Sequence, residues 1–357
     1  MKRQVSMLVL IVLVSAFLSG CGLWMDGTRV SVTPHLQQNV QTKDELVSAS
    51  TYTDIRNTLK DKIGAGETNG VISVSVIDEE TARYYMDTSI QYLRKNDPVC
   101  AYAVEDVSYD LAVNRDETVI AFQVSYYHPR AELLRIKQTN SVKEASSVIS
   151  AVLDNCETSV VMMVRRFEPV DFVQIVQDYA NNNPSVIMET PKVSVGIYPE
   201  QGDERIVELH FTYQTSREVL RDMRERVEPV FTSAELYVKG ATQVSDIYSQ
   251  LYSFLMERYE YRVETSITPT YSLLLHGVGD SRAFANVYAA MCRNAELDCK
   301  VVSGTKNGEP WVWNLVRLRG DYYHVDLLQC SQDGRFRMLT DSEMAGYVWD
   351  YTASKIN

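Results

Sequence analysis

Two segments of this chain repeat one another 87 residues apart, and this repeat limits the folds open to the chain more than any other feature. Residues 119–136, VIAFQVSYYHPRAELLRI, align with residues 206–223, IVELHFTYQTSREVLRDM, so that Tyr126 meets Tyr213. In both segments apolar and polar residues alternate, which is typical of a strand with one buried face. The repeat therefore predicts two copies of one small structural unit.

The predicted elements follow the same order in both copies: a helix, a short apolar strand, a second helix and two longer strands. In the first copy we expect helices near residues 53–63 and 80–94 and strands at 71–77, 104–113 and 118–127. In the second copy we expect helices at residues 141–155 and 169–182 and strands at 159–167, 192–198 and 205–213. This pattern predicts a tandem pair of α-β-α-β-β modules of the α+β class, over residues 49–140 and 141–238.

The two modules carry no group of reactive side chains in their sequences. His128 and His210 each stand alone, and a single histidine serves packing or solvation more often than ligand binding. We therefore expect the modules to act as a spacer or as a binding surface, roles that depend on shape rather than on chemistry.

The first 21 residues have the features of an export signal. Lys2 and Arg3 precede an apolar run from Met7 to Leu18, which is shorter than the about 20 residues that a membrane-spanning helix needs. The segment ends in Leu-Ser-Gly-Cys at Cys21. Residues 22–48 are polar and only weakly periodic, which predicts a tether between this end and the folded body.

The Leu-Ser-Gly-Cys end resembles the lipobox of bacterial lipoproteins. The resemblance implies that Cys21 is acylated and becomes the mature N-terminus, so that lipid anchors the chain at the extracytoplasmic face of the cell membrane. Several acyl chains on one residue give stable anchoring, whereas one chain alone binds weakly. The alternative is a plain signal peptide in which the cysteine is incidental.

The charge of the chain bears on its partners. Removal of Lys2 and Arg3 with the signal changes the formal charge from −12 to −14. Such a body is a poor electrostatic partner for nucleic acid or for an anionic lipid surface. The remaining candidate partners are the membrane, through the N-terminal lipid, and a peptide, protein or glycan of the envelope.

Five cysteines remain after Cys21, and no two of them form a C-x-x-C pair. They are Cys100, Cys156, Cys292, Cys299 and Cys330. The odd number argues against a zinc site and against a complete disulfide framework, although export permits one or two bridges. We expect no metal and no cofactor, and the disulfide pairing stays open.

A different pattern begins near residue 242. An amphipathic helix is expected within residues 244–261, and a second helix follows Gly279, Asp280 and Ser281. Three strands are expected after it, at residues 299–304, 311–318 and 321–328.

This helix and its antiparallel sheet resemble the transglutaminase-like superfamily, which has a papain-like fold, and we assign the resemblance to a domain at residues 239–357. The segments that carry it are GDSRAFANVYAAMC, VVSG, WVWN, YYHVD and the tail MLTDSEMAGYVWD. Active members of that family have a cysteine at the start of the helix, a histidine at the start of the next core strand, and an aspartate after a segment like Tyr-His-Val. The thiolate attacks, the histidine moves the proton, and the aspartate orients the histidine.

The resemblance places the cysteine at Ser281, the histidine at Trp311 and the aspartate at Asp326. Counting from Gly279 matches the opening of the motif but puts the helix out of step, and neither count yields a thiol. An indole has no basic nitrogen, and a serine hydroxyl without a base is a weak nucleophile. We therefore predict a degenerate catalytic triad in a domain that binds or scaffolds.

Three alternatives remain. In the first, the domain is an acyl transferase or peptidase in which Ser281, His324 and Asp326 act together, because His324 precedes Asp326 by two residues and would share its face of a strand. His276, before the helix, is a weaker candidate base. In the second, Asp280 and Ser281 are only helix N-cap residues. In the third, the domain serves only to stabilise or present the tandem modules.

Overall fold

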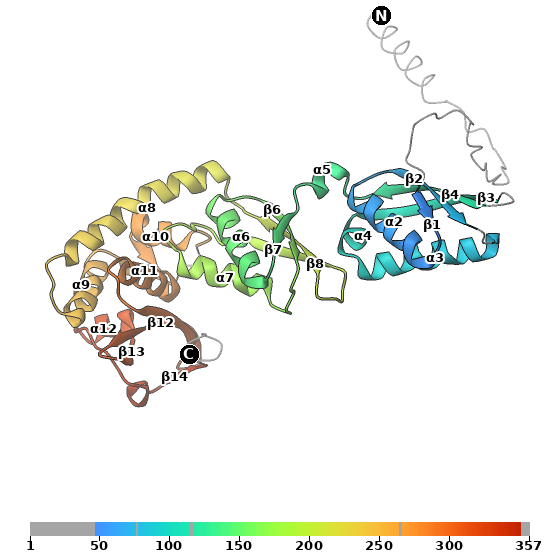
Figure 1. Ribbon diagram of the computed structural model, residues 1–357. Coiled ribbons are helices and arrows are strands. Elements are labelled where there is room, and N and C mark those ends of the chain that lie inside the picture. Colours follow the sequence, from blue (N-terminus) through green and yellow to red (C-terminus); the bar gives the residue numbers. More distant parts are fainter. Residues whose placement is uncertain (1–46, 76–77, 114–116, 264–265, 351–357) are drawn as a thin grey trace, which may run out of the picture. The chain divides into compact units, whose positions relative to one another are not determined.

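The computed structural model describes residues 47–75, 78–113, 117–263 and 266–350 (Figure 1). Every described residue belongs to one compact unit, residues 45–357. The predicted signal peptide, Cys21 and most of the predicted tether therefore lie outside the described residues. Within the described residues, no helix combines the length and the apolar character needed to cross a membrane.

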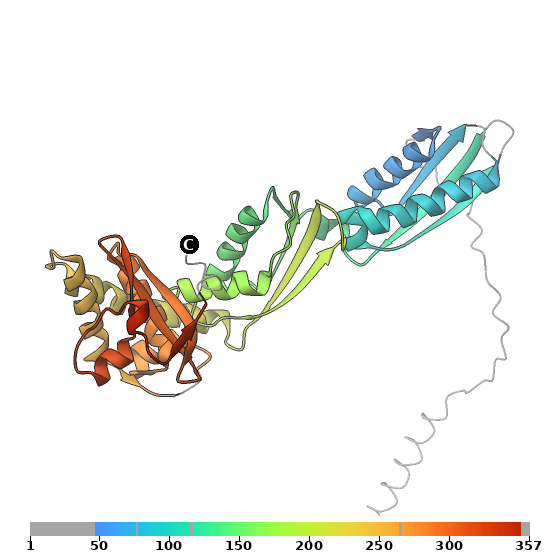
Figure 2. The same cartoon turned by 90° about the horizontal axis from the view of Figure 1, so that it is seen from below.

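The first module is a four-stranded sheet with two long helices. Its strands lie in the order β1-β2-β4-β3, with β1 parallel to β2 and the other neighbours antiparallel. Figure 2 shows its two long helices, α2 and α3, against the sheet. The elements are β1 (Val47–Ala49), α2 (Tyr52–Gly64), β2 (Asn69–Ser75), α3 (Glu79–Asn96), α4 (Pro98–Ala103), β3 (Val104–Val113) and β4 (Glu117–Tyr126).

The second module repeats this topology, with strand order β5-β6-β8-β7 and β5 parallel to β6. A short helix, α5 (Arg130–Leu133), precedes it. Its elements are β5 (Lys137–Thr139), α6 (Val142–Asp154), β6 (Ser159–Val164), α7 (Phe172–Asn182), β7 (Lys192–Tyr198) and β8 (Arg205–Thr212).

The repeat extends to individual backbone hydrogen bonds. Val124 N donates to Thr68 O at 2.8 Å, and Phe211 N donates to Thr158 O at the same distance in the second copy. The predicted α+β class and the order of helices and strands are confirmed. Each copy also has a leading three-residue strand that was not predicted, and β1 lies inside the stretch predicted as tether.

The first helix of each copy begins at a polar cap, which explains why the sequences fold alike there. The Thr51 hydroxyl accepts a hydrogen bond from Asp54 N, and the Asp54 carboxylate accepts one from Thr51 N. The Ser141 hydroxyl likewise accepts from Glu144 N, while Glu144 accepts from Asn140 N. Each arrangement satisfies amides that the helix itself leaves unpaired.

The C-terminal region packs a helical layer against an antiparallel sheet of order β13-β12-β11-β14. Two short parallel strands, β9 and β10, lie beside the central helix α11. The helices are α8 (Arg217–Val238), α9 (Val244–Met256), α10 (Pro269–His276), α11 (Ser281–Asn294), α12 (Leu327–Gln332) and the 3-10 helix η1 (Asp341–Glu343). The strands are β9 (Glu260–Tyr261), β10 (Val278–Gly279), β11 (Cys299–Lys306), β12 (Glu309–Leu318), β13 (Asp321–Val325) and β14 (Tyr347–Trp349).

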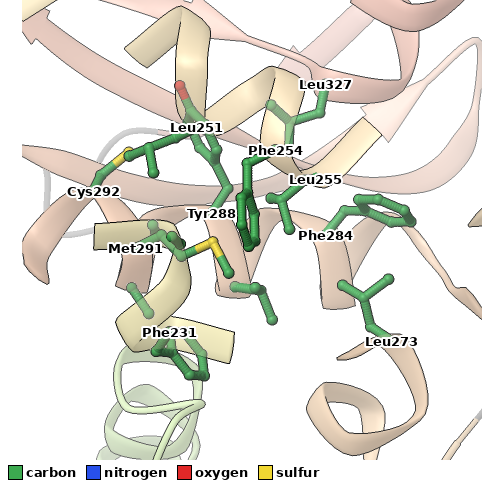
Figure 3. Close-up of a cluster of buried hydrophobic side chains, with 14 of the residues drawn as sticks. Phe231, Leu251, Phe254, Leu255, Leu273, Phe284, Tyr288, Met291, Cys292 and Leu327 are labelled. Carbon is green, nitrogen blue, oxygen red and sulfur yellow. The ribbon is translucent and has the colours of Figure 1, made fainter. Parts of the chain in front are cut away.

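Helix α11 lies at the centre of this region and buries all ten residues from Ala283 to Cys292. A helix that is buried on every side must have partners all round, and α11 contacts β11 and β12 as well as α8, α9 and α10. Figure 3 shows its Phe284 and Tyr288 among side chains of α8, α9 and α10. The Tyr288 hydroxyl donates to Tyr248 O at 2.9 Å, so its one polar group is satisfied.

Helix α8 was not predicted as an element of its own. It packs on α9 and α10, and its buried Val227 and Phe231 belong to the same core as α11. The helix precedes residue 239, where the C-terminal domain was expected to begin. The domain boundaries in the chain stay predictions.

Candidate functional site

The start of α11 is built from a glycine turn and a capping carboxylate. Gly277 ends α10 with a φ of +83°, a conformation that favours glycine. The chain then pairs Gly279 with Tyr261 in the β9–β10 ladder. Asp280 is the N-cap of α11, and its carboxylate accepts a hydrogen bond from Ala283 N at 2.8 Å.

Ser281 is the first residue of α11, so it follows the cap rather than forming it. Its side chain is half-buried, and its hydroxyl has no hydrogen-bond partner among the residues that the structure describes. Gly279 is buried, and a Cβ atom there would lie 3.0 Å from the Ala283 Cβ and 3.1 Å from the Leu273 Cδ1. Gly279 offers no side chain, and none of the described residues is bonded to the Ser281 hydroxyl as a base.

Trp311 occupies the start of β12, where the family resemblance placed the histidine. Its indole Nε1 donates a hydrogen bond to Asp326 Oδ2 at 2.8 Å. Its ring packs against Tyr261, with ring centroids 5.7 Å apart. Nε1–H is the only polar group of an indole, so the Trp311 side chain can form no further hydrogen bond.

Asp326 lies just beyond the strand that was expected to contain it. Strand β13 ends at Val325, and Asp326 is the N-cap of α12, accepting from Leu328 N at 3.0 Å and Gln329 N at 3.1 Å. Its other oxygen, Oδ2, accepts from Trp311 and also from Lys306 and Tyr347. The side chain is buried, and five donors share its two oxygens. The Asp326 carboxylate therefore has a structural role, because it joins the start of α12 to the side chains around it.

Lys306 and Tyr347 complete this group, and sequence reasoning missed both. They pair in register across β11 and β14. The Lys306 ammonium lies 3.1 Å from Asp326 Oδ2 and 4.8 Å from the centroid of the Trp311 ring. The Tyr347 hydroxyl donates to the same oxygen at 2.6 Å. We call Lys306, Trp311, Asp326 and Tyr347 the Asp326 cluster.

Hydrogen bonds and opposite charges hold the Asp326 cluster together. Burial, and then the bond to the Asp326 carboxylate, raise the pKa of Tyr347, so its hydroxyl stays a donor. The Lys306 cation and the Asp326 anion neutralise one another, and the face of the Trp311 ring adds a cation–π contact. The donors that the Asp326 oxygens accept come from other residues and not from the Ser281 hydroxyl.

His324 takes part in a different group. It is fully buried, and its Nδ1 accepts from Trp313 Nε1 at 2.8 Å while Nε2 lies 3.2 Å from Asp341 Oδ1. An indole nitrogen only donates. Nδ1 is therefore the acceptor and Nε2 carries the proton that it donates to Asp341.

The direction of His324 argues against the alternative in which it serves Ser281 as a base. His324 pairs with Leu315 on β12, and paired residues project from the same face of a sheet. The neighbouring Asn314 projects from the opposite face, where its Nδ2 donates to Ala285 O of α11. His324 thus points away from the helix that carries Ser281. The structure does not bring Ser281 and His324 together, and the exposed His276 makes a ring contact with Tyr271 instead.

The buried state of His324 predicts a dependence of stability on pH. Burial lowers the pKa of His324 below its ordinary value of 6.5, although Asp341 opposes this shift. As the pH falls, the unfolded chain therefore binds the proton before the folded chain does. The stability that neutral His324 contributes is complete above pH 6.5 and is lost as the pH falls toward the folded pKa. We expect the midpoint of thermal unfolding, followed by circular dichroism, to drop across this range.

Two variants separate His324 from other titrating groups. The His324→Asn variant should be less stable at neutral pH and should lose most of the dependence below pH 6.5. The His210→Asn variant, at a largely exposed position, should behave like the wild type. An unchanged slope in the His324→Asn variant would contradict this assignment.

The described cysteines are free thiols, and most are buried. Burial raises the pKa of Cys100 to about 12 and that of Cys330 to about 11. Thiols in this state are poor nucleophiles at neutral pH. Across the described ranges, His, Cys, Asp and Glu side chains form no group of three that could ligate a metal.

Comparison with known proteins places this site in a recognised kind of domain. Residues 232–327 match the transglutaminase-like superfamily. No curated protein matches the chain. Solved structures that are similar to part of the chain include a provisionally described cysteine protease from Cytophaga hutchinsonii, with 11% identity over 44% of this chain and 70% of that chain at a TM-score of 0.27.

Two further solved structures are similar to parts of the chain. One is a TGase, with 10% identity over 54% of this chain and 59% of that chain at a TM-score of 0.27. The other is a provisionally described protease from Parabacteroides distasonis, with 8% identity over 72% of this chain and 40% of that chain at a TM-score of 0.24. The chain therefore spans less than two thirds of the length of both.

Proposed function

We propose that this chain, whose C-terminal region contains a transglutaminase-like domain, is a membrane-anchored lipoprotein in which that domain is catalytically inactive. In this proposal the domain serves as a binding or scaffolding module at the cell envelope, facing away from the cytoplasm. Its partner is a peptide, protein or glycan of the envelope.

The observation that carries this proposal is the 2.8 Å bond from Trp311 Nε1 to Asp326 Oδ2. In a thiol enzyme the aspartate orients an imidazole, which accepts the proton of the nucleophile. Here an indole fills the place of the imidazole and takes the aspartate as its acceptor. Asp326 keeps its structural contacts, whereas the imidazole that would move a proton is replaced by the indole of Trp311.

The surroundings of Ser281 support the same conclusion. His324, the stronger of the two imidazoles considered as a base, is fully buried and held by Trp313 and Asp341 on the other face of the sheet. A serine hydroxyl needs an adjacent base to attack an acyl group at neutral pH. Without such a base, the fold is kept for its shape and surface.

The anchoring part of the proposal rests on the N-terminal sequence. Lys2 and Arg3, the apolar run that follows and the Leu-Ser-Gly-Cys end occur together, and the mature chain would begin at Cys21. Acylation of that cysteine would hold the modules and the C-terminal domain at the membrane surface.

A turnover assay tests the catalytic part. The purified protein is incubated with a glutamine-containing peptide and a primary amine, and ammonia release, amide exchange and peptide hydrolysis are measured. We expect the wild type and the Ser281→Ala variant to give the same background, because the hydroxyl has no base. Turnover that is present in the wild type and absent in Ser281→Ala would refute inactivity. An active transglutaminase assayed in parallel shows that the substrates are competent.

A further inference from the structure

Two of the described thiols lie together in the core of the C-terminal region. Cys292 is on α11, one turn beyond Tyr288, and is fully buried. Cys299 is the first residue of β11 and is 4% exposed. Both belong to the core that α11 shares with the sheet and with α9.

The register of the sheet directs Cys299 toward α11. Cys299 pairs with Val316 on β12, and Val316 is fully buried in the core beneath α11. Asn314, two residues earlier on β12, projects from the same face and donates to Ala285 O of α11. Since paired residues share a face, the Cys299 side chain projects toward the helix that carries Cys292.

The turn between the two residues brings them side by side. Helix α11 ends at Asn294, and Glu296 follows with a φ of 60°. Leu297 N then donates back to Cys292 O at 2.9 Å. This reversal returns the chain to Cys292 just before β11 begins. Burial raises the pKa of Cys292, and the neighbouring Cys299 thiol is the next cause that raises it.

Both thiols are free in this structure. We propose that in the exported protein Cys292 and Cys299 form an intrachain disulfide that links the end of α11 to the start of β11. The proposal rests on the extracytoplasmic location in the proposed function, because disulfides persist in such compartments. It goes beyond that function, since it assigns a covalent modification to two residues that lie outside the Asp326 cluster.

The oxidant is a disulfide-bearing thiol oxidant of the envelope. While the chain folds and the thiols are still accessible, one cysteine thiolate attacks the oxidant, forms a mixed disulfide and releases one thiol. The second cysteine thiolate then attacks the chain's sulfur and displaces the other thiol of the oxidant. The chain loses two protons and two electrons, and the oxidant is reduced to a dithiol.

Peptide mapping of the exported chain tests the pair directly. The full-length protein is produced in a bacterial host, and its membrane fraction is denatured in N-ethylmaleimide and digested with trypsin without reduction. Trypsin cuts after Arg282, Arg293 and Lys300, so each cysteine lies in its own peptide, 283–293 or 294–300. We expect these peptides to be joined and to weigh two hydrogens less than their sum. Recovery of both peptides with maleimide on their cysteines would overturn the proposal.

A matched variant and a second preparation complete the test. In Cys292→Ser the joined peptides should disappear and Cys299 should carry maleimide, whereas Cys299 joined to another cysteine would overturn the pair. Absence of the protein from the membrane fraction would refute the proposed location alone. In that case the disulfide is tested by the same peptide mapping on full-length protein that has been reduced and then refolded with glutathione and glutathione disulfide. Joined peptides support the pair, and alkylated ones refute it.

Discussion

We expect the Asp326→Ala variant to have a free energy of unfolding about 3–5 kcal/mol below that of the wild type. The change removes the carboxylate that faces the Lys306 ammonium, whose side chain is only 16% exposed. It also leaves the Trp311 Nε1–H and the Tyr347 hydroxyl without their acceptor, and it uncaps α12. An unpaired buried cation and several unsatisfied donors each cost free energy, so the loss exceeds that of an ordinary surface change.

Urea unfolding followed by circular dichroism measures this loss. Asp333→Ala is the matched control, because Asp333 lies at the other end of α12 in an exposed ion pair with Arg337. We expect the control to unfold at nearly the wild-type urea concentration. Asp326→Asn should fall between the two, since an amide can still cap α12 but cannot pair with Lys306. Equal effects of Asp326→Ala and Asp333→Ala would show that the Asp326 cluster is not a structural unit.

The Cys21→Ala variant is expected to lose lipid completely. Cells that make the protein are grown with radiolabelled palmitate, and the label in the purified chain is measured. The wild type should carry label, because the Leu-Ser-Gly-Cys end presents Cys21 for acylation. The variant should carry none, because one residue bears all the acyl chains that give stable anchoring.

The matched control for this experiment is Cys100→Ala, which removes another cysteine of the chain. Cys100 is buried in the core of the first module, and its loss should leave the label at the wild-type level. Label in the Cys21→Ala variant equal to that of the wild type would contradict the lipoprotein proposal. Absence of label from the wild type would contradict it as well.

The tandem modules could be predicted because most of their strands and helices are long enough to show the periodic spacing of apolar residues. Strand β3 (Val104–Val113) has the predicted bounds, and α6 (Val142–Asp154) lies within its predicted range. Strands β1 and β5 could not be predicted, because each has three residues and exists through parallel pairing with β2 or β6. Such pairing depends on partners distant in sequence, which local propensity does not report.

The candidate positions of the site came from the family resemblance, whereas the contacts around them come from strand pairing. The resemblance supplied Ser281, Trp311 and Asp326. Lys306 and Tyr347 reach Asp326 only because β14 pairs with β11, and no local pattern signals that register. The alternation along one strand likewise does not show which face meets α11, so the sequence left open whether His324 projects toward Ser281.

The most direct measurement of the central claim is acyl transfer to the Ser281 hydroxyl itself. The purified full-length protein is incubated with an activated acyl ester, digested with trypsin, and the peptide 263–282 is mapped by mass spectrometry. Because the indole of Trp311 and not an imidazole is bonded to Asp326, we predict no more acylation of Ser281 than of the exposed Ser233 on α8. Stoichiometric acylation of Ser281 in the wild type, lost in the His324→Asn variant, would show that a working base reaches the hydroxyl and would contradict inactivity.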